Sequence, residues 1–181
     1  HPFCDTNPPV AAVQANIVGQ MVILEAARLF GIKKLVWASS VVVFGPREAH
    51  PRLPVPNDAP HHPVNVYGAS KSFAEFLTLH YDKTWGIDTL GLRFTLVYGP
   101  GRVSGASAFI NDMIVNAALG KPVEVSFGDD TIDWQYVVDI ARLVVKCSKI
   151  DRTKTRIFNT KCDHRSVKAG GDYVKSLIPE A

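Results

Sequence analysis

Apolar positions recur every three or four residues in two long segments of the chain. The first covers residues 10–30, follows Pro8-Pro9 and is bounded by Gly31, and the second covers residues 64–84 and ends near Gly86. Proline near the start and glycine just past the end are typical of helix boundaries. The pattern therefore predicts two long helices.

Short apolar runs rich in β-branched residues follow each of these helices. The runs are 34–39, with a further β-prone piece at 41–44, and 88–98, which stops at Gly99-Pro100-Gly101. Continuous runs of this kind indicate strands buried on both faces of a parallel sheet. Between the two strands, residues 45–63 are rich in proline and predict a long loop.

The rest of the chain alternates in the same way. The pattern predicts a helix at 106–120, a strand at 122–127, a helix at 134–150, a strand at 156–160 and a helix at 166–179, with Ser166 as the N-cap of the last one. Strands separated by helices indicate βαβ units, so we predict an α/β fold with a parallel sheet.

Composition narrows the classes of function. The 181 residues carry a formal charge of +3 without a basic run, so we expect no nucleic-acid partner. Uninterrupted apolar stretches stay below 18 residues, and the N-terminal residues lack the pattern of a signal peptide, so we expect no membrane span.

Cysteines and histidines give no sign of a metal site. Cys4, Cys147 and Cys162 are few, odd in number and far apart, which argues against disulfides and zinc and favours reduced thiols in the cytoplasm. His61 and His62 lie side by side in the proline-rich loop, without a third ligand nearby in sequence. We therefore predict no metal.

Tyr67 and Lys71, four residues apart at the start of the second helix, form the candidate chemistry. Residues at this spacing share one helix face. An ammonium beside a phenol lowers the phenol's pKa, which would let Tyr67 exchange a proton with a substrate hydroxyl. Ser40, at the end of the first strand, is a candidate to hold the substrate oxygen. The alternative interpretation is that Tyr67 and Lys71 merely belong to an exposed helix face. Ser40 would then only cap a turn.

Five segments taken together resemble the extended short-chain dehydrogenase/reductase superfamily, and within it the NAD-dependent epimerase/dehydratase family. In chain order they are "NIVGQMVILEAARLFGIKKLVWASS", "WASSVVVFG", "PVPNDAPHHPVNVYGASK", "LRFTLVYGPGR" and "DWQYVVDIARLVV". The resemblance covers essentially the whole chain. It implies a Rossmann-type parallel sheet, a small mixed substrate-binding part, and NAD or NADP as cofactor.

The resemblance also implies roles for individual residues. Tyr67 matches the catalytic acid/base, Lys71 its electrostatic partner and a ligand of the nicotinamide ribose, and Ser40 the serine that orients the substrate hydroxyl. All three would also contact the cofactor, together with Asn16 on the first helix. Without the resemblance, Asn16 would be read as an ordinary polar helix residue.

Further positions bear on the cofactor and the substrate. Phe94 and Thr95 match the stretch that lies against the nicotinamide. Many nucleotide-sugar enzymes of the family have an asparagine where this chain has Leu96, and an arginine where it has Ile132. Arg102 is a candidate to replace the missing charge toward a substrate diphosphate. The alternative interpretation is that Arg102 is a solvated loop residue.

These departures leave several functions open. The leading hypothesis is an enzyme that oxidises a hydroxyl of a nucleotide sugar and then, as an epimerase or dehydratase, returns the hydride. The alternatives are an NADP-dependent ketone or aldehyde reductase of the same superfamily, and a dinucleotide-binding protein without catalysis.

The family's strand-GxxGxxG-helix motif, which binds the dinucleotide pyrophosphate, does not occur in the sequence. We therefore interpret the chain as an internal fragment, and expect it to be poorly stable and inactive alone. We assign 1–100 to the C-terminal part of a Rossmann domain and 101–181 to a partial substrate-binding region with returning Rossmann elements. The helices near 8–30 and 64–84 resemble the pair through which family members form homodimers.

Overall fold

A computed structural model describes residues 8–125 and 127–179, which divide into two compact units. The first unit holds the described residues up to Phe94 together with Leu143–Thr160, and the second holds Thr95–Arg142 and the described residues from Lys161. Helix α6 (Val137–Lys149) runs from the second unit into the first. We describe each unit by itself.

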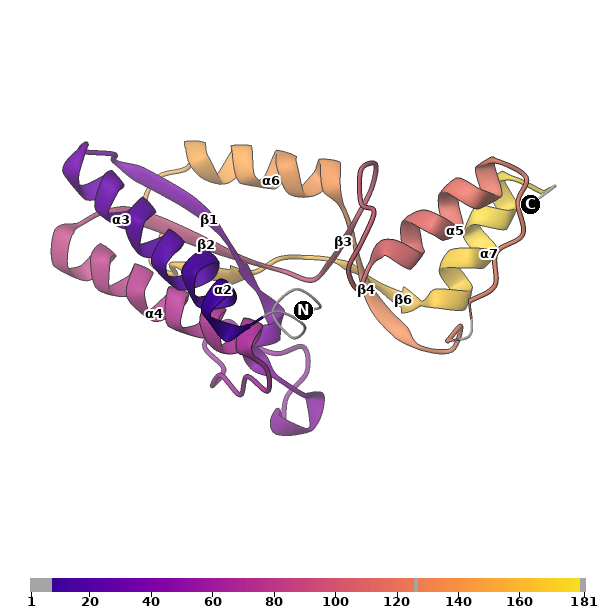
Figure 1. The fold of residues 1–181 in the computed structure, drawn as a ribbon, viewed down its shortest axis with the longest axis horizontal. Helices are drawn as coiled ribbons and strands as arrows, with labels where there is room; N and C mark the ends of the chain where they lie inside the picture. Colours follow the sequence, from indigo (N-terminus) through magenta and orange to yellow (C-terminus); the bar gives the residue numbers. More distant parts are fainter. Residues whose placement is uncertain (1–7, 126, 180–181) are drawn as a thin grey trace. The chain divides into compact units, whose positions relative to one another are not determined.

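A three-stranded parallel sheet forms the middle of the first unit, with the strand order β1-β2-β5 (Figure 1). The strands are β1 (Lys34–Ser40), β2 (Asp88–Phe94) and β5 (Ile157–Asn159). The register places Ser40 beside Phe94 and Ser39 beside Arg93. The parallel α/β arrangement that the sequence predicted is confirmed, and the carboxyl ends of β1 and β2 lie at one edge.

The two faces of β2 differ in chemistry because its side chains alternate. Leu90 and Leu92 are buried against the Cys147 side of α6. Arg93 points to the opposite face, where it bonds to α4 (Val66–Trp85). One face of the sheet is therefore an apolar core, whereas the other contains buried polar groups.

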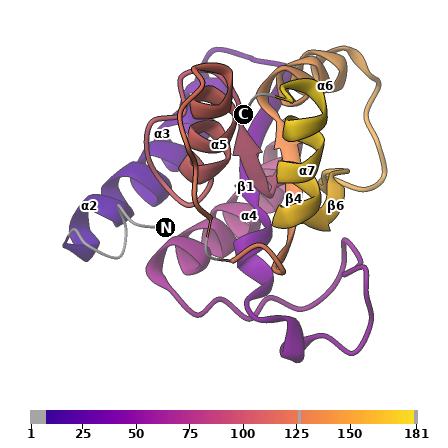
Figure 2. The ribbon, with the colours of Figure 1, turned by 90° about the vertical axis from the view of Figure 1, so that its right-hand side faces the viewer.

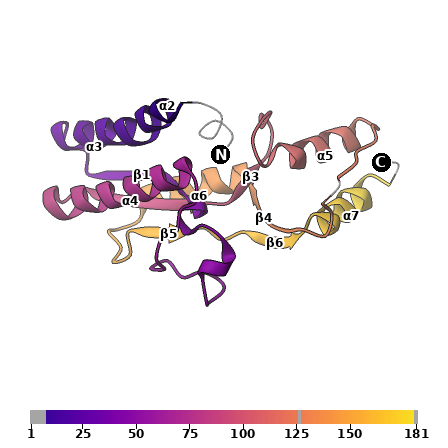
Figure 3. The same ribbon diagram turned by 60° about the horizontal axis from the view of Figure 1, so that its bottom comes forward.

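The first predicted helix is one helical run with a local irregularity. It consists of α2 (Pro9–Val13), a π-helical segment η1 (Gln14–Val18) and α3 (Gly19–Leu29), and it lies along α4 (Figure 3). Leu24 and Ala27 form a buried cluster with Tyr81 of α4 and Ile87. The packing of both long helices on each other confirms the two helices predicted from periodicity.

The run Pro9–Leu29 is, among the described residues, the single helix long and apolar enough to cross a membrane, with a mean hydropathy of 1.5 over its best window. Polar residues interrupt it, which is why no uninterrupted apolar stretch marks it in the sequence. A helix of a globular core passes the same test of length and composition, so this property does not distinguish a membrane-spanning helix from a core helix.

The second unit contains a small mixed sheet with the order β3-β4-β6. Strand β3 (Leu96–Tyr98) is parallel to β4 (Thr131–Tyr136), and β4 is antiparallel to β6 (Asp163–Ser166). Helices α5 (Ala108–Ala118) and α7 (Val167–Leu177) contact each other beside it (Figure 2). Ile110, Met113 and Trp134 form its buried core.

Several predicted elements are confirmed and others are wrong. The helices at 106–120 and 166–179 and the strand at 156–160 are present, and Ser166 caps α7 by accepting a hydrogen bond from Ala169 N at 3.1 Å. Residues 122–125 form no strand, and the β-prone piece at 41–44 is a 3-10 turn, η2 (Val41–Phe44). The predicted strand 88–98 is two strands in different sheets, and 134–136 belong to β4 rather than to a helix.

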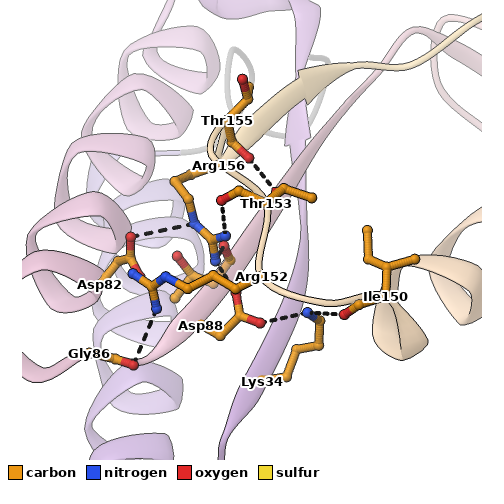
Figure 4. A network of polar contacts seen from close by, with 10 residues as sticks. Lys34, Asp82, Gly86, Asp88, Ile150, Arg152, Thr153, Thr155 and Arg156 are labelled. Atoms are coloured by element: carbon orange, nitrogen blue, oxygen red, sulfur yellow. Dashed lines mark hydrogen bonds and ion pairs between the residues drawn. The ribbon is translucent and has the colours of Figure 1, made fainter.

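Charged side chains link the amino-terminal ends of β1 and β2 to the segment after α6 (Figure 4). We call Lys34, Asp82, Asp88, Arg152 and Arg156 the amino-end cluster. Lys34 Nζ lies 2.6 Å from Asp88 Oδ2, and Arg152 Nη2 lies 2.5 Å from Asp82 Oδ1. Arg156 pairs with both aspartates and donates to the carbonyl of Thr153. This cluster closes the end of the sheet opposite to Ser40.

Candidate active site at the carboxyl end of the parallel sheet

Ser40 ends β1 and begins the turn η2. Its side chain is almost completely buried, and Oγ accepts a hydrogen bond from Val42 N at 3.3 Å, which caps the turn. This is the turn-cap alternative considered for the sequence, and it fixes the hydroxyl at the carboxyl end of the strand. Because Phe94 lies beside Ser40 in the register, two of the predicted site residues are neighbours.

Helix α4 presents Tyr67 and Lys71 in its first two turns. The helix begins at the N-cap Asn65, whose Oδ1 accepts from Gly68 N at 2.8 Å. Lys71 Nζ donates to the carbonyl of Ala38 at 2.9 Å and lies 5.8 Å from the centroid of the Tyr67 ring. The ammonium group therefore joins the helix to β1 two residues before Ser40, within cation–π range of the tyrosine.

Gly68 allows this close approach of helix and turn. A β-carbon at this position would lie 2.8 Å from Val42 O and 3.1 Å from Pro63 Cβ, both closer than ordinary contacts. Sequence reasoning missed this role, although the small residues between Tyr67 and Lys71 are the signal that points to it. The missing side chain lets the start of α4 lie directly on the turn that follows Ser40.

A set of mutually bonded polar groups, all buried except the half-buried His61, lies next to these residues. We call Ser39, His61, Glu75 and Arg93 the carboxyl-end cluster. Glu75 Oε1 accepts from Ser39 Oγ at 2.5 Å and from Arg93 Nε at 2.8 Å, and Oε2 accepts from Arg93 Nη2 at 2.7 Å. Glu75 is 2% and Arg93 3% exposed, so both charges are held within the protein.

The environment of Glu75 favours its charged form. Burial raises the pKa of this carboxyl, but the bonds from Arg93, His61 and Ser39 outweigh it and lower the pKa from 4.5 to about 2. A buried carboxylate with this many donors stays ionised at neutral pH. Glu75 is therefore a fixed negative charge between α4 and the sheet.

Arg93 connects this carboxylate to the rest of the unit. Its Nη1 donates to Asn57 O at 2.8 Å and to Asn159 Oδ1 at 3.1 Å, and its guanidinium carbon lies 4.6 Å from the centroid of the Phe44 ring. Four of its five N–H groups have partners in Glu75, Asn57 and Asn159, and the fifth has one in the tautomer where His61 Nε2 accepts from Nη2. Arg93 joins β2, β5, α4 and the proline-rich loop in one contact set.

His61 attaches the proline-rich loop to the same cluster. Its Nδ1 lies 2.7 Å from Ser72 Oγ, and its Nε2 lies 3.1 Å from Arg93 Nη2 and 3.2 Å from Glu75 Oε2. Nε2 accepts from Arg93 in one tautomer and donates to Glu75 in the other. A cavity of about 780 Å³, lined partly by His61, Ser72 and Glu75, opens beside these groups.

The remaining predicted site residues lie in other elements. Asn16 is half-buried in the π-helical segment η1. Thr95 and Arg102 belong to the second unit. Thr95 N donates to Gln135 Oε1 at 2.9 Å, which places the residue after Phe94 in a polar environment of its own unit.

Arg102 lines a cavity of about 500 Å³ in the second unit, together with Tyr98, Asn111 and Tyr136. Its buried Nε has no hydrogen-bond partner within the described part of the chain. A buried N–H without a partner is unusual and fits a position that receives an acceptor from a ligand. Ile132, by contrast, packs against Ile110 and Trp134, so that position is part of the apolar core.

Metal binding finds no support in this arrangement. Across residues 8–125 and 127–179, no group of three or more histidine, cysteine or acidic side chains is placed to hold an ion. Cys4 lies outside the described residues. Burial raises the pKa of the Cys147 thiol, and burial together with Asp133 raises that of Cys162 to about 11, so both thiols stay protonated at neutral pH.

Comparisons with known proteins give a family match. The model of the NAD dependent epimerase/dehydratase family matches residues 4–159. The UDP-glucuronate 4-epimerase of Thermodesulfobacterium geofontis is 35% identical over 138 residues, which cover 74% of this chain and 40% of that protein. The chain thus spans less than half the length of this relative.

Solved structures of related folds cover nearly the whole chain. The UDP-N-acetylglucosamine 4-epimerase from Methanobrevibacter ruminantium, in complex with UDP-N-acetylmuramic acid, has a TM-score of 0.81 at 23% identity and covers 94% of this chain and 55% of that one. A GalE-like L-threonine dehydrogenase from Cupriavidus necator has a TM-score of 0.86 at 21% identity and covers 99% and 59%. At these identities the likeness shows the Rossmann-type fold.

Proposed function

This chain belongs to the NAD dependent epimerase/dehydratase family, and from that premise we propose that its protein oxidises a hydroxyl carbon of a nucleotide sugar with NAD or NADP. The observation that carries the proposal is the placement of Ser40, Tyr67 and Lys71 at one edge of the parallel sheet, with Lys71 bonded to β1. Ligands of open α/β sheets bind at this edge.

The donor set at this edge fits one end of the cofactor. A lysine ammonium and a tyrosine hydroxyl are donors suited to ribose hydroxyls, and Ser40 adds a third polar group. The printed sequence contains no GxxGxxG, so these residues account for the nicotinamide-ribose end and not for the pyrophosphate. When bound, the nicotinamide supplies hydride acceptance and return.

The proton chemistry falls to the residues of the chain. Ser40 orients the substrate hydroxyl, and Tyr67 removes its proton as general base. Lys71 favours the phenolate form of Tyr67 by its charge. In an epimerase Tyr67 would give the proton back as the hydride returns to the substrate carbon. In a dehydratase the hydride would also return to the substrate, so neither reaction would leave reduced cofactor.

Two features bear on the substrate. Arg102 and its unpartnered Nε offer a charged donor in the second unit, which suits a diphosphate. The relatives of this chain include a UDP-glucuronate 4-epimerase and a UDP-glucose 4-epimerase. We therefore place UDP-sugars first among nucleotide sugars.

A second candidate is a reductase of ketones or aldehydes. The apolar burial of Ile132 favours it, because this position cannot supply the arginine that many nucleotide-sugar enzymes use. The two candidates differ in one outcome. A reductase leaves a net change in cofactor redox state, whereas an epimerase does not.

The test uses the protein expressed from its complete gene, with NAD or NADP and a panel of UDP-sugars. We expect conversion of one UDP-sugar to its epimer, seen by chromatography, without lasting nicotinamide absorbance change. A stoichiometric absorbance change would support the reductase instead. Failure to convert any substrate, with cofactor binding intact, would support the non-catalytic alternative.

We also propose that the protein forms a homodimer through the two long helices. They expose apolar side chains that the first unit does not cover, among them Met21, Val22, Phe73, Phe76 and Leu79. Sedimentation of the complete protein, compared with a Val22→Glu, Phe76→Glu variant, tests this. A monomeric wild type would contradict it. The cytoplasmic location inferred from the cysteines stays a prediction.

A further inference from the structure

Three of the four members of the carboxyl-end cluster adjoin predicted site residues. Ser39 directly precedes Ser40, and Arg93 directly precedes Phe94. Glu75 follows Lys71 by four residues, one helical turn further along α4. The carboxylate of Glu75 therefore bonds to both strands that carry site residues, from the helix that carries Tyr67 and Lys71.

We propose that Glu75 is a positioning residue, which through Ser39 and Arg93 fixes the catalytic helix α4 relative to the strand end that presents Ser40. The inference rests on the proposed function, because it concerns the geometry of that same site. Glu75 does not reach the reacting atoms in this account. It acts on the placement of Tyr67 and Lys71.

Three features make Glu75 suited to this role. Its carboxylate accepts three hydrogen bonds from two strands, two of them from the planar guanidinium of Arg93. Paired bonds of this kind constrain orientation as well as distance. Glu75 is almost completely buried, so a lost partner would leave its carboxylate poorly solvated. These bonds therefore fix the position of α4 relative to β1 and β2.

Lys71 by itself gives a weaker constraint. Its ammonium lies at the end of a flexible side chain and donates to the carbonyl of Ala38. A compact ammonium constrains orientation less than a planar guanidinium with paired bonds does. A lysine that must also contact a bound ribose needs a helix whose position is set by other contacts. Since misplacement of about 1 Å can cost on the order of 100-fold in rate, the Ser39–Glu75 bond should influence catalysis more than stability.

The amino-end cluster provides a matched control. Asp88 is also a partly buried carboxylate with two cationic partners, Lys34 and Arg156. It lies at the start of β2, at the opposite end of the strand from Arg93. A change of Asp88 to asparagine therefore alters charge and packing in the same unit without touching the site.

The experiment compares Ser39→Ala with Asp88→Asn in the protein expressed from its complete gene. Ser39→Ala removes one hydroxyl and leaves the Glu75–Arg93 ion pair in place, so it avoids the folding defect that Glu75→Gln risks. Three quantities are measured: the thermal midpoint, kcat and KM with the UDP-sugar, and the titration midpoint of Tyr67 by NMR of ring-labelled tyrosine.

We expect Ser39→Ala to lower kcat about 10-fold with KM within about twofold, and to move the Tyr67 titration to higher pH, because a displaced Lys71 favours the phenolate less. Asp88→Asn should lower the thermal midpoint and leave kcat and the Tyr67 titration unchanged. Wild-type kcat and Tyr67 titration in Ser39→Ala would overturn the proposal. Equal shifts in both variants would also overturn it.

The NMR titration separates this proposal from the proposed function. If the wild-type protein converts no UDP-sugar, the function fails, yet the Tyr67 midpoint still reports whether Ser39 and Glu75 position the helix. If the wild type converts a UDP-sugar and Ser39→Ala does not differ from it, the positioning role alone fails.

Discussion

The amino-end and carboxyl-end clusters lie at the two ends of strand β2 and differ in how their charged side chains are paired and buried. In the carboxyl-end cluster one guanidinium bonds to Glu75, Asn57 and Asn159, and the side chains of Arg93 and Glu75 are 4% and 3% exposed. In the amino-end cluster the charges are spread over five residues, and the side chain of Arg152 is 49% exposed (Figure 4).

This difference indicates two kinds of constraint. The amino-end cluster ties chain segments together through several ion pairs, and its half-exposed member Arg152 can be lost at little cost because water replaces it. The carboxyl-end cluster lacks such compensation, because removal of one partner leaves a buried charge unpaired. A precise geometry is thus maintained at the end of the sheet that carries the candidate site.

Replacing Arg93 should have the largest effect on stability. Arg93→Ala leaves the Glu75 carboxylate buried without its main partner, and we expect a loss of about 3–5 kcal/mol in the free energy of unfolding. Urea denaturation followed by circular dichroism measures it. A loss comparable to that of Arg152→Ala would contradict the distinction between the two clusters.

The second-largest effect on stability should come from acid, acting on the carboxyl-end cluster. The folded-state pKa of Glu75, about 2, lies below its ordinary value of 4.5. Its stabilisation is therefore fully present above pH 4.5 and is lost as the pH falls toward 2, on the order of 3 kcal/mol in total. Unfolding free energies measured across this range should fall steeply in the wild type.

The control for this titration is Glu75→Gln. Its stability should be lower at neutral pH but should fall less between pH 4.5 and 2, because the titrating group is gone. Asp88 retains part of the acid dependence, since Lys34 and Arg156 outweigh burial and lower its pKa. An unchanged slope in Glu75→Gln would show that the cluster does not hold the carboxylate ionised.

Asp88→Asn should have a smaller effect on stability than Arg93→Ala. Lys34 keeps its bond to Ile150 O, and Arg156 keeps its bond to Thr153 O. We expect a loss of about 1–2 kcal/mol by urea denaturation. A loss as large as that of Arg93→Ala would remove the contrast between the clusters.

The helix cap beside the site should show the smallest effect of the series. Asn65→Ala removes the acceptor for Gly68 N, at an expected cost of about 1 kcal/mol. Ser166→Ala removes an equivalent cap from α7 in the second unit and is the matched control. If both cost the same stability but only Asn65→Ala alters turnover, the start of α4 matters for chemistry.

Much of the fold follows from periodicity, because long helices and buried strands leave clear patterns. The errors lie where tertiary contacts override local preference. Val41–Phe44 is β-prone, yet it turns because Ser40 caps it and the start of α4 packs on it. Residues 134–136 read as helical, yet they pair with β3 in the small sheet.

The site was predictable in part. Ser40, Tyr67 and Lys71 carry recognisable spacing, and the structure places them at one sheet edge. The partnership of Glu75 and Arg93 needs the fold, since 18 residues separate them. A signal did exist: a charged residue inside the apolar strand "LGLRF" requires a buried partner of opposite charge.

The proton role of Tyr67 is the central claim, and the Tyr67→Phe variant of the protein expressed from its complete gene tests it most directly. The phenyl ring keeps the packing and removes only the hydroxyl. We expect kcat with the UDP-sugar to fall by about 10²–10⁴, while the thermal midpoint stays near that of the wild type. Undiminished turnover in Tyr67→Phe would contradict the account.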